Sequence, residues 1–270
     1  MAYRIAINGF GRIGRSILRA LYESTNYSAL RIVAINDVAD IETLAHLTRY
    51  DSTHGRFIGT VAVERDSGDL LVNEDRIATS QTSEPGSLPW ADLGVDLVME
   101  CSGAFSDRAN ADQHLKSGAH RVLFSQPAES DVDATLVYGI NHETLSASAS
   151  IVSNASCTTN CIVPVLKALD DSFVLQSGAI TTIHSAMNDQ PVIDGYHNSD
   201  LRRTRSAMQS IIPVNTELAR GIERILPNLS GRLEAQAIRV PTVNVSAMDL
   251  TVTLAQKVTV EQVNNVLREY

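Results

Sequence analysis

A cysteine lies at a point in the chain where an apolar strand should turn into a helix. The apolar pair 151–152 is followed by SNASCTTNC over 153–161 and by an apolar stretch, 162–169, that is long enough for a helix. Serine and asparagine cap helix N-termini, so Cys157 is expected in the first helical turn. Free backbone N–H groups and the helix dipole there would lower its pKa below the free reference of about 8.5. Cys157 is therefore a candidate nucleophile, with a buried structural cysteine as the alternative.

A histidine and several arginines further along could serve this thiol. Residues 178–185 alternate as a strand does and carry His184 near the strand's end. A helix-start cysteine and a strand histidine can form a thiolate–imidazolium pair, although a lone strand histidine is more often an ordinary core or surface residue. Residues 188–204 are too long for an ordinary connection, and the basic cluster 202–205 either binds an anion or faces solvent. Arg239, on a later strand, would be a buried charge that a phosphate could satisfy with bidentate hydrogen bonds.

A glycine-rich motif stands in the context of a dinucleotide-binding fingerprint. GFGRIG at 9–14 follows the strand-like run 3–8 and opens a helical pattern over 15–24. A second strand, 31–36, ends at Asp37, about 20 positions further on, where an acidic residue contacts the ribose in such folds. The three glycines would allow the tight turn, the close approach of the pyrophosphate and the packing of helix on strand. Asp37 would repel a 2′-phosphate, so NAD is expected rather than NADP; a glycine-rich turn without a ligand is the alternative.

The order of the elements predicts an α/β protein, a Rossmann-type doubly wound domain followed by an α+β domain. Strands are expected at 3–8, 31–36, 60–64, 70–73, 95–101, 121–125, 136–139, 151–152, 178–185, 232–240 and 243–254, and helices at 15–24, 109–117, from 157 onward and at 260–269. Strands and helices alternate to about residue 156, which is typical of a doubly wound sheet whose strand ends face the cofactor. Later strands follow one another and indicate a mostly antiparallel sheet. We expect an NAD-binding domain over 1–156 and a catalytic domain over 157–270.

The composition excludes several classes of protein. The 270 residues carry a net charge of -9, which argues against a nucleic-acid or membrane-surface protein. No apolar run approaches the roughly 20 residues of a membrane span, and no signal-peptide pattern precedes the first strand. Three cysteines argue against a disulfide framework and fit a reducing cytoplasm. Cys157 and Cys161 could form half of a metal site, but no second pair at ligand spacing completes it, so no metal is expected.

Six segments resemble those of the phosphorylating glyceraldehyde-3-phosphate dehydrogenase family. They are GFGRIG at 9–14, SNASCTTN at 153–160, TTIHS at 181–185, DLRRTR at 200–205, SIIP at 210–213 and RVPT at 239–242. The similarity runs the length of the chain. Within the family, residues 184–187 and 212–216 are most similar to the branch that oxidises D-erythrose 4-phosphate.

The resemblance implies a role for each matching residue. Cys157 would attack an aldehyde, and His184 would lower the thiol pKa and move the proton during hydride transfer to NAD. The implied cofactor contacts are Gly9, Phe10, Gly11, Arg12, Ile13, Gly14, Asp37 and Ser125, and the implied contacts of substrate and phosphate are Ser156, Thr158, Arg203, Thr216, Glu217 and Arg239. The family also implies a homotetramer in which the segment 188–204 crosses a subunit interface and completes the neighbour's cofactor site.

Two departures from the family pattern affect the expected chemistry. Met187 stands where glyceraldehyde enzymes usually carry a threonine that binds a phosphate, and a thioether cannot donate a hydrogen bond. We therefore expect a weakened phosphate subsite and water in place of phosphate as the acyl acceptor. Family members also extend some tens of residues past the position of Tyr270. The resemblance implies that this chain lacks the last strands of the catalytic sheet, an asparagine that holds the nicotinamide, and a long helix, and that sheet edge and core are left uncovered.

Two other functions remain open at this point. One is a phosphorylating glyceraldehyde-3-phosphate dehydrogenase, which differs in substrate and in its need for phosphate. The other is an inactive fragment or NAD-binding protein that acts through interactions or thiol sensing, in which Cys157 would react without aldehyde turnover.

Overall fold

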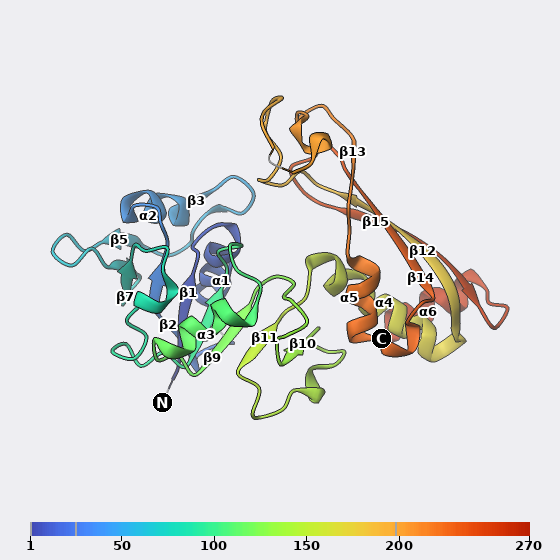
Figure 1. Ribbon diagram of the computed structural model, residues 1–270, viewed down its shortest axis with the longest axis horizontal. Helices are drawn as coiled ribbons and strands as arrows, with labels where there is room; N and C mark the ends of the chain where they lie inside the picture. Colours follow the sequence, from blue (N-terminus) through green and yellow to red (C-terminus); the bar gives the residue numbers. More distant parts are fainter. Residues whose placement is uncertain (1, 25, 198) are drawn as a thin grey trace. The chain divides into compact units, whose positions relative to one another are not determined.

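The computed structural model describes residues 2–24, 26–197 and 199–270, and the chain divides into two compact units (Figure 1). Unit 1 comprises the residues up to 136 together with 143–155, and unit 2 comprises 137–142 and 156–270. The predicted α/β class is confirmed, since a mostly parallel sheet in unit 1 is followed by an antiparallel-rich sheet in unit 2.

Unit 1 is built on a nine-stranded sheet of order β10-β11-β9-β8-β1-β2-β7-β6-β5. Its strands are β1 (Tyr3–Asn8), β2 (Leu30–Asn36), β5 (Val61–Val63), β6 (Leu70–Val72), β7 (Asp75–Ser80), β8 (Leu97–Glu100), β9 (Arg121–Phe124), β10 (Ala134–Thr135) and β11 (Ile151–Ser153). The strands from β10 to β7 run parallel, and the edge strands β5 and β6 are antiparallel. The chain winds outward from β1 toward β2 on one side and from β8 on the other. The carboxyl ends of β1 and β8 therefore form the switch point at which such sheets bind ligands.

Helices cover both faces of this sheet because successive strand residues point to opposite sides. Ala6 packs in a cluster with Ala111 of α3 (Arg108–Lys116). Its neighbour Ile7 packs in a second cluster with Leu18 of α1 (Arg12–Glu23) and Leu44 of α2 (Ile41–Arg49). A small hairpin, β3 (Tyr50–Asp51) and β4 (Gly55–Arg56), follows α2, and 3₁₀ turns lie at Pro85–Ser87 and His142–Thr144.

Unit 2 contains a four-stranded sheet of order β13-β14-β12-β15 with three α-helices. Its elements are α4 (Cys157–Phe173), β12 (Leu175–His184), β13 (Ile212–Val214), α5 (Leu218–Ile225), β14 (Leu233–Arg239), β15 (Ala247–Leu254), α6 (Val260–Glu269) and two 3₁₀ turns, Leu201–Thr204 and Pro227–Leu229. Two of the pairings are antiparallel, while β12 and β14 run parallel. The parallel pair sets His184 and Arg239 directly beside each other at the ends of their strands.

Several expected strands differ in extent from those observed, and two of them differ most. Residues 136–139 do not form a strand, because Gly139 adopts a φ of +88° that breaks extended structure, and β10 ends earlier, at Thr135. Residues 243–246 are also irregular, and β15 begins only at Ala247.

Helices α2 and α5 and strands β3, β4, β7 and β13 were not expected from the sequence. The start of α2 carries a signal that was overlooked: the Asp40 side chain accepts a hydrogen bond from the Thr43 N–H at 2.9 Å. Aspartate at that position is a strong N-cap. The helix was not recognised because only three of its nine residues are buried, so its apolar pattern is short.

Candidate active site

Cys157 is the first residue of α4 and is exposed. The turn before it uses Ala155, which is buried and has a left-handed φ of +57°. Ser156 is the N-cap, and its Oγ accepts a hydrogen bond from the Thr159 N–H at 2.9 Å. The predicted position of the Cys157 thiol in the first helical turn is therefore confirmed. The helix N-terminus favours the thiolate form at this position.

His184 ends β12 with its Nε2 atom 3.8 Å from the Sγ of Cys157. Its Nδ1 lies 2.7 Å from the carbonyl oxygen of Ser185. Because a carbonyl only accepts, Nδ1 carries the proton and Nε2 is left to take the proton of the thiol. The hydrogen bond with His184 lowers the pKa of Cys157, while burial opposes the shift. The same bond raises the pKa of His184.

Arg239 is only 5% exposed, and its charge is matched by Asp189. The guanidinium binds both carboxylate oxygens, with Nη2 3.0 Å from Oδ2 and a shorter contact between Nη1 and Oδ1. Arg203 contacts the same carboxylate, with Nη1 2.9 Å from Oδ2. Burial would raise the pKa of Asp189, but Arg239 and Arg203 hold it below its usual value. The expected partner of Arg239 was a phosphate, and the sequence analysis did not consider Asp189, since nothing marks it within a polar stretch.

Met187 contributes a softer contact to this group. Its sulfur lies 3.5 Å from Nη2 of Arg239. We refer to Met187, Asp189, Arg203 and Arg239 as the arginine clasp. The clasp contains two of the residues expected to bind phosphate, and a carboxylate stands between them as an anion would.

The remaining expected substrate contacts fall into two groups. Ser156 and Thr158 lie together, with their hydroxyl oxygens 2.9 Å apart. Thr216 and Glu217 directly precede α5, and the Thr216 hydroxyl accepts a hydrogen bond from the Leu218 N–H at 3.2 Å, while Glu217 pairs with Arg220. Among the described residues, the printed hydrogen bonds and ion pairs of Thr216 and Glu217 do not reach Cys157 or the clasp. Their contact with substrate stays a prediction.

Unit 1 has a cavity of about 290 Å³ at the carboxyl ends of β1, β2 and β8. Gly9, Gly11 and Asp37 line it. Asp37 follows β2, and its carboxylate accepts hydrogen bonds from the N–H groups of Phe10 at 2.6 Å and Ala39 at 2.9 Å. The fingerprint loop and the acidic residue are therefore joined, as expected for a site that holds a ribose and a pyrophosphate.

The three glycines fit a dinucleotide site in different ways. A Cβ on Gly9, whose φ is +86°, would lie 2.3 Å from the Cα of Ser102, and a Cβ on Gly14 would lie 2.4 Å from the carbonyl oxygen of Gly9. A Cβ on Gly11 would meet nothing within 4 Å. Gly9 and Gly14 are therefore required by the fold, while the open space above Gly11 suits a ligand that approaches the backbone closely.

This difference gives a matched pair of variants. Gly11→Ala should fold with an unchanged Tm, because its backbone (φ −72°, ψ −153°) suits alanine, yet weaken NAD binding by about tenfold or more. Gly9→Ala should instead lower the free energy of unfolding by roughly 3 kcal/mol, through its positive φ and its clash with backbone. Calorimetry of unfolding and of NAD titration separates the two. Unchanged affinity in a folded Gly11→Ala protein would contradict this account of the loop.

Five expected cofactor contacts are not among the residues that line this cavity: Phe10, Arg12, Ile13, Gly14 and Ser125. The Arg12 side chain pairs with Asp51, and Ile13 is 52% exposed. Ser125 donates its N–H to the carbonyl oxygen of Glu100 at 3.0 Å and its side chain hydrogen-bonds to Cys101, which lines the cavity. Backbone contacts of Arg12 and Ile13 and a contact of Ser125 with the nicotinamide remain predictions.

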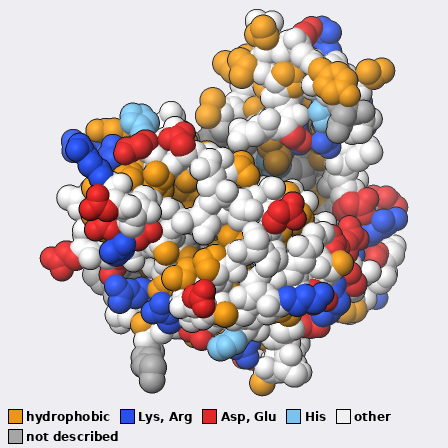
Figure 2. Space-filling view, turned by 60° about the vertical axis from the view of Figure 1, so that its left-hand side comes forward, with side chains coloured by type: hydrophobic (Ala, Val, Ile, Leu, Met, Phe, Trp, Pro, Cys, Tyr) orange, Lys and Arg blue, Asp and Glu red, His pale blue; other side chains and the backbone are white. Residues whose placement is uncertain are grey.

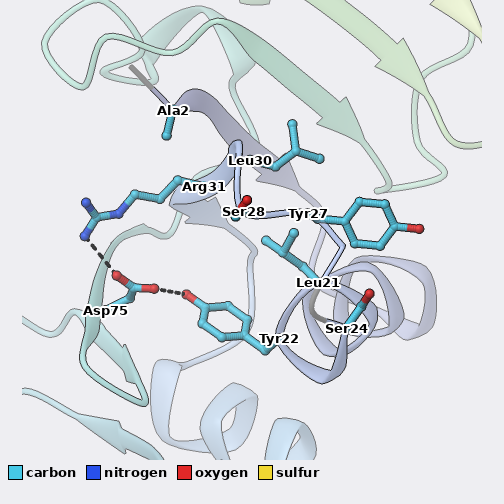
Figure 3. A pocket seen from close by; sticks show the side chains of 9 residues that line it. All are labelled: Ala2, Leu21, Tyr22, Ser24, Tyr27, Ser28, Leu30, Arg31 and Asp75. Carbon is cyan, nitrogen blue, oxygen red and sulfur yellow. Dashed lines mark hydrogen bonds and ion pairs between the residues drawn. The ribbon is translucent and has the colours of Figure 1, made fainter.

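A larger cavity lies elsewhere on unit 1, near the amino ends of β1 and β2 (Figure 3). It measures about 570 Å³, and its charged groups bind one another: Asp75 accepts from the Tyr22 hydroxyl and from Arg31, both at 2.9 Å. Ligand sites in parallel sheets lie at the carboxyl ends, so the smaller cavity is the candidate site.

Within residues 2–24, 26–197 and 199–270, no group of three His, Cys, Asp or Glu side chains could hold a metal ion. No helix in the same residues is long and apolar enough to cross a membrane.

A doubly wound domain with a dinucleotide fingerprint, followed by a domain with a paired cysteine and histidine, defines an NAD-dependent oxidoreductase. Comparison with known families is more specific. Residues 3–108 match the glyceraldehyde 3-phosphate dehydrogenase NAD binding domain, and residues 156–270 match the glyceraldehyde 3-phosphate dehydrogenase C-terminal domain. The chain belongs to the glyceraldehyde 3-phosphate dehydrogenase family, and its cofactor is NAD.

Proposed function

We propose that the chain oxidises D-erythrose 4-phosphate to 4-phosphoerythronate, as a D-erythrose-4-phosphate dehydrogenase supplying pyridoxal 5′-phosphate synthesis. The observation that carries an aldehyde oxidation is the pair of Cys157 and His184, 3.8 Å apart, with the pKa of the thiol lowered. A thiolate adds readily to an aldehyde carbon, whereas an alcohol does not need a cysteine to lose a hydride.

The residues of unit 2 would act in a fixed order. The thiolate of Cys157 adds to the aldehyde carbon, and His184 gives its proton to the new alkoxide, forming a hemithioacetal. His184 then takes back the hydroxyl proton as the hydride leaves, which produces a thioacyl group on Cys157. NAD⁺, when bound, accepts that hydride. Water next adds to the thioacyl carbon, the carbon–sulfur bond breaks, and the acid is released with the thiolate restored.

The phosphate of the substrate would be held by the remaining polar groups of the unit. Hydroxyls of Ser156, Thr158 and Thr216 can donate hydrogen bonds, and Arg203 and Arg239 can bind a phosphate bidentately. Glu217 would line the same site. The close hydroxyls of Ser156 and Thr158 and the convergence of both arginines on Asp189 support this assignment.

The arginine clasp supports release of the acyl group by water. Asp189 neutralises charge on Arg239 and Arg203, and Met187 offers sulfur where a hydroxyl could donate. If the substrate's phosphate occupies these arginines, an incoming inorganic phosphate meets a thioether at Met187, which cannot donate a hydrogen bond. Free phosphate is therefore a poor competitor with water at this site.

Met187→Thr should bring back part of the phosphate dependence. We expect inorganic phosphate to accelerate turnover of this variant by about threefold or more, because a new hydroxyl adds one hydrogen bond worth about 1 kcal/mol. Met208→Thr, at an exposed methionine of the same unit, is the matched control. Steady-state NADH formation with and without phosphate measures it, and equal phosphate response in wild type and Met187→Thr would contradict the argument.

The test of the proposed function is NADH formation with erythrose 4-phosphate and with glyceraldehyde 3-phosphate, each with and without inorganic phosphate. Phosphate-independent oxidation of the four-carbon sugar is the expected result. The second candidate is the phosphorylating glyceraldehyde-3-phosphate dehydrogenase, which the names of both matched domains favour. Phosphate-dependent oxidation of the three-carbon sugar would establish it instead. A reactive Cys157 without turnover of either sugar would indicate a thiol-sensing protein.

The assembly we propose is a homotetramer. The segment 188–204 exposes large apolar side chains to solvent: Ile193 is 76% exposed, Tyr196 89% and Leu201 83%. Figure 2 shows hydrophobic side chains gathered near the top of that view, where this segment lies. Exposed apolar groups of this size favour an interface, here with a second copy of the chain. We also propose a cytoplasmic location, which the free thiols of the three cysteines support.

A further inference from the structure

A buried carboxylate takes no part in the chemistry described so far, but it is hydrogen-bonded to two residues that line the NAD cavity, Asn8 and Ser102. Glu100 ends β8 and is 0% exposed. It is surrounded by donors: Ser102 binds Oε1 through its N–H at 2.8 Å and through its hydroxyl, while Asn8 at 2.5 Å and His114 at 3.1 Å bind Oε2. A carboxylate taken out of water is costly unless hydrogen bonds or an opposite charge compensate it.

The imidazole that faces Glu100 is neutral. The indole N–H of Trp90 lies 3.0 Å from Nδ1 of His114. Because indole nitrogen can only donate, Nδ1 must accept and carries no proton. The single ring proton is therefore on Nε2, which donates to Glu100. Among the described residues, the ion pairs of Glu100 include no lysine or arginine, so its charge is met by dipoles and not by a cation.

The amide on the other side is fixed in the same way. The backbone N–H of Thr82 donates to Oδ1 of Asn36 at 3.1 Å, and Nδ2 of Asn36 donates to the Thr82 carbonyl at 3.0 Å. The same Nδ2 donates to Oδ1 of Asn8 at 2.7 Å. The Nδ2 group of Asn8 must then point toward Glu100. Two chains of hydrogen bonds therefore end on the Glu100 carboxylate, one from Thr82 through Asn36 and Asn8 and one from Trp90 through His114. In each chain every group donates toward the carboxylate.

The Asn8 amide, the His114 Nε2–H and the Ser102 backbone N–H can only donate to Glu100, so each carboxylate oxygen faces at least one donor that cannot act as an acceptor. A proton on it would face a donor and lose a hydrogen bond. Burial alone would raise the pKa of Glu100, but the bonds from His114, Ser102 and Asn8 outweigh it and lower the pKa. The fold therefore stores a fixed negative charge at this position.

The hydrogen-bond network around this charge reaches the NAD cavity. Four members of the network, Asn8, Asn36, Thr82 and Ser102, line the NAD cavity. The carbonyl of Glu100 also accepts the N–H of Ser125, the residue proposed to lie near the nicotinamide, at 3.0 Å. The step from cavity to nicotinamide rests on that part of the proposed function.

We propose that Glu100 is a positioning residue that also sets the redox preference of the site, by making it bind NAD⁺ better, relative to NADH, than a neutral side chain would. The two forms of the cofactor differ by one positive charge on the nicotinamide ring. A fixed negative charge in a medium of low dielectric stabilises the charged ring and not the neutral one. An effect on the shape of the cavity, in contrast, would change the affinity for both forms equally.

The experiment measures the Kd of NAD⁺ and of NADH by calorimetry, without aldehyde, for the full chain and for Glu100→Gln. The ratio Kd(NADH)/Kd(NAD⁺) should fall about fivefold in Glu100→Gln, which corresponds to about 1 kcal/mol. Glu74→Gln, at an exposed glutamate in the β6–β7 turn, removes the same charge from unit 1 and should leave the ratio unchanged. A ratio that stays within twofold of wild type in Glu100→Gln overturns the proposal, even if both affinities fall.

The glutamine amide in Glu100→Gln would face other hydrogen-bond donors, so this variant could fold poorly. Two further measurements test the proposal in that case. The double variant Asn8→Asp/Glu100→Gln returns an acceptor and a negative charge to the network, and it should regain a wild-type ratio; a ratio lowered about fivefold would overturn the proposal. In the wild-type protein, ¹⁵N NMR at neutral pH should show His114 neutral with its proton on Nε2. A doubly protonated ring would mean that the charge is cancelled, and would also overturn it. Because no aldehyde is used, failure of the proposed substrate leaves these results unaffected.

Discussion

Replacing Cys157 by serine should abolish aldehyde oxidation, with kcat lowered by about 10⁴-fold or more. The hydroxyl of serine has no lowered pKa to match that of the thiol, so His184 would face a group that stays protonated at neutral pH. NAD binding should persist, because the residues of the cofactor cavity all belong to unit 1. Stopped-flow measurement of NADH formation and calorimetry of NAD binding check both parts.

Cys161→Ser is the matched control for this experiment. Cys161 lies one helical turn after Cys157 on α4 and is also exposed. Its side chain is not one of those assigned to the reaction. Turnover in Cys161→Ser should stay close to wild type. Activity retained by Cys157→Ser, or lost only in Cys161→Ser, would show that the nucleophile has been assigned wrongly.

Replacing His184 by glutamine should lower kcat by about 10² to 10⁴-fold and change how Cys157 responds to pH. His184 lowers the pKa of the thiol, so in the wild type the thiolate persists to a pH below the usual range of cysteine and is lost only as pH falls through the lowered value. Without the imidazole, the pH at which iodoacetamide alkylates Cys157 should move upward. Alkylation rates measured across pH, with the site located by peptide mass mapping, report this shift.

The control for the histidine experiment is His120→Gln, an exposed histidine of unit 1 whose side chain lies near Asp96. It should leave both kcat and the alkylation profile unchanged. If the profile of Cys157 is the same in wild type and in His184→Gln, the lowered pKa comes from the helix N-terminus alone, and His184 is not the base.

The parts of the fold and of the site that could be predicted are those that depend on contacts between residues close in sequence. The cap at Ser156 puts Cys157 at the start of α4, and the spacing of the fingerprint glycines sets the loop before α1. Both depend on interactions within a few residues, which short-range chemistry determines. Helix α6 was predicted with the bounds that it has, since its start carries a capping box.

Partners brought together from distant parts of the chain could not be predicted. Arg239 was expected to be a buried charge, but its match with Asp189 depends on how the segment after β12 folds back over β14. The bonds of Glu100 to Asn8 and His114 likewise join the ends of different strands and a helix, and nothing in the local sequence of any of them shows the others. Contacts of this kind depend on the order of the strands in each sheet. The sequence predicted the class of each sheet but not the order of its strands.

The most direct test of the central claim is a single turnover with erythrose 4-phosphate and NAD⁺, quenched in acid and examined by peptide mass spectrometry. We expect a thioacyl adduct on the peptide of α4 that contains Cys157, formed together with one NADH per chain. The adduct should decay with the release of acid when quenching is delayed. NADH formed without any adduct, or an adduct on Cys101 or Cys161 instead, would contradict covalent catalysis by Cys157.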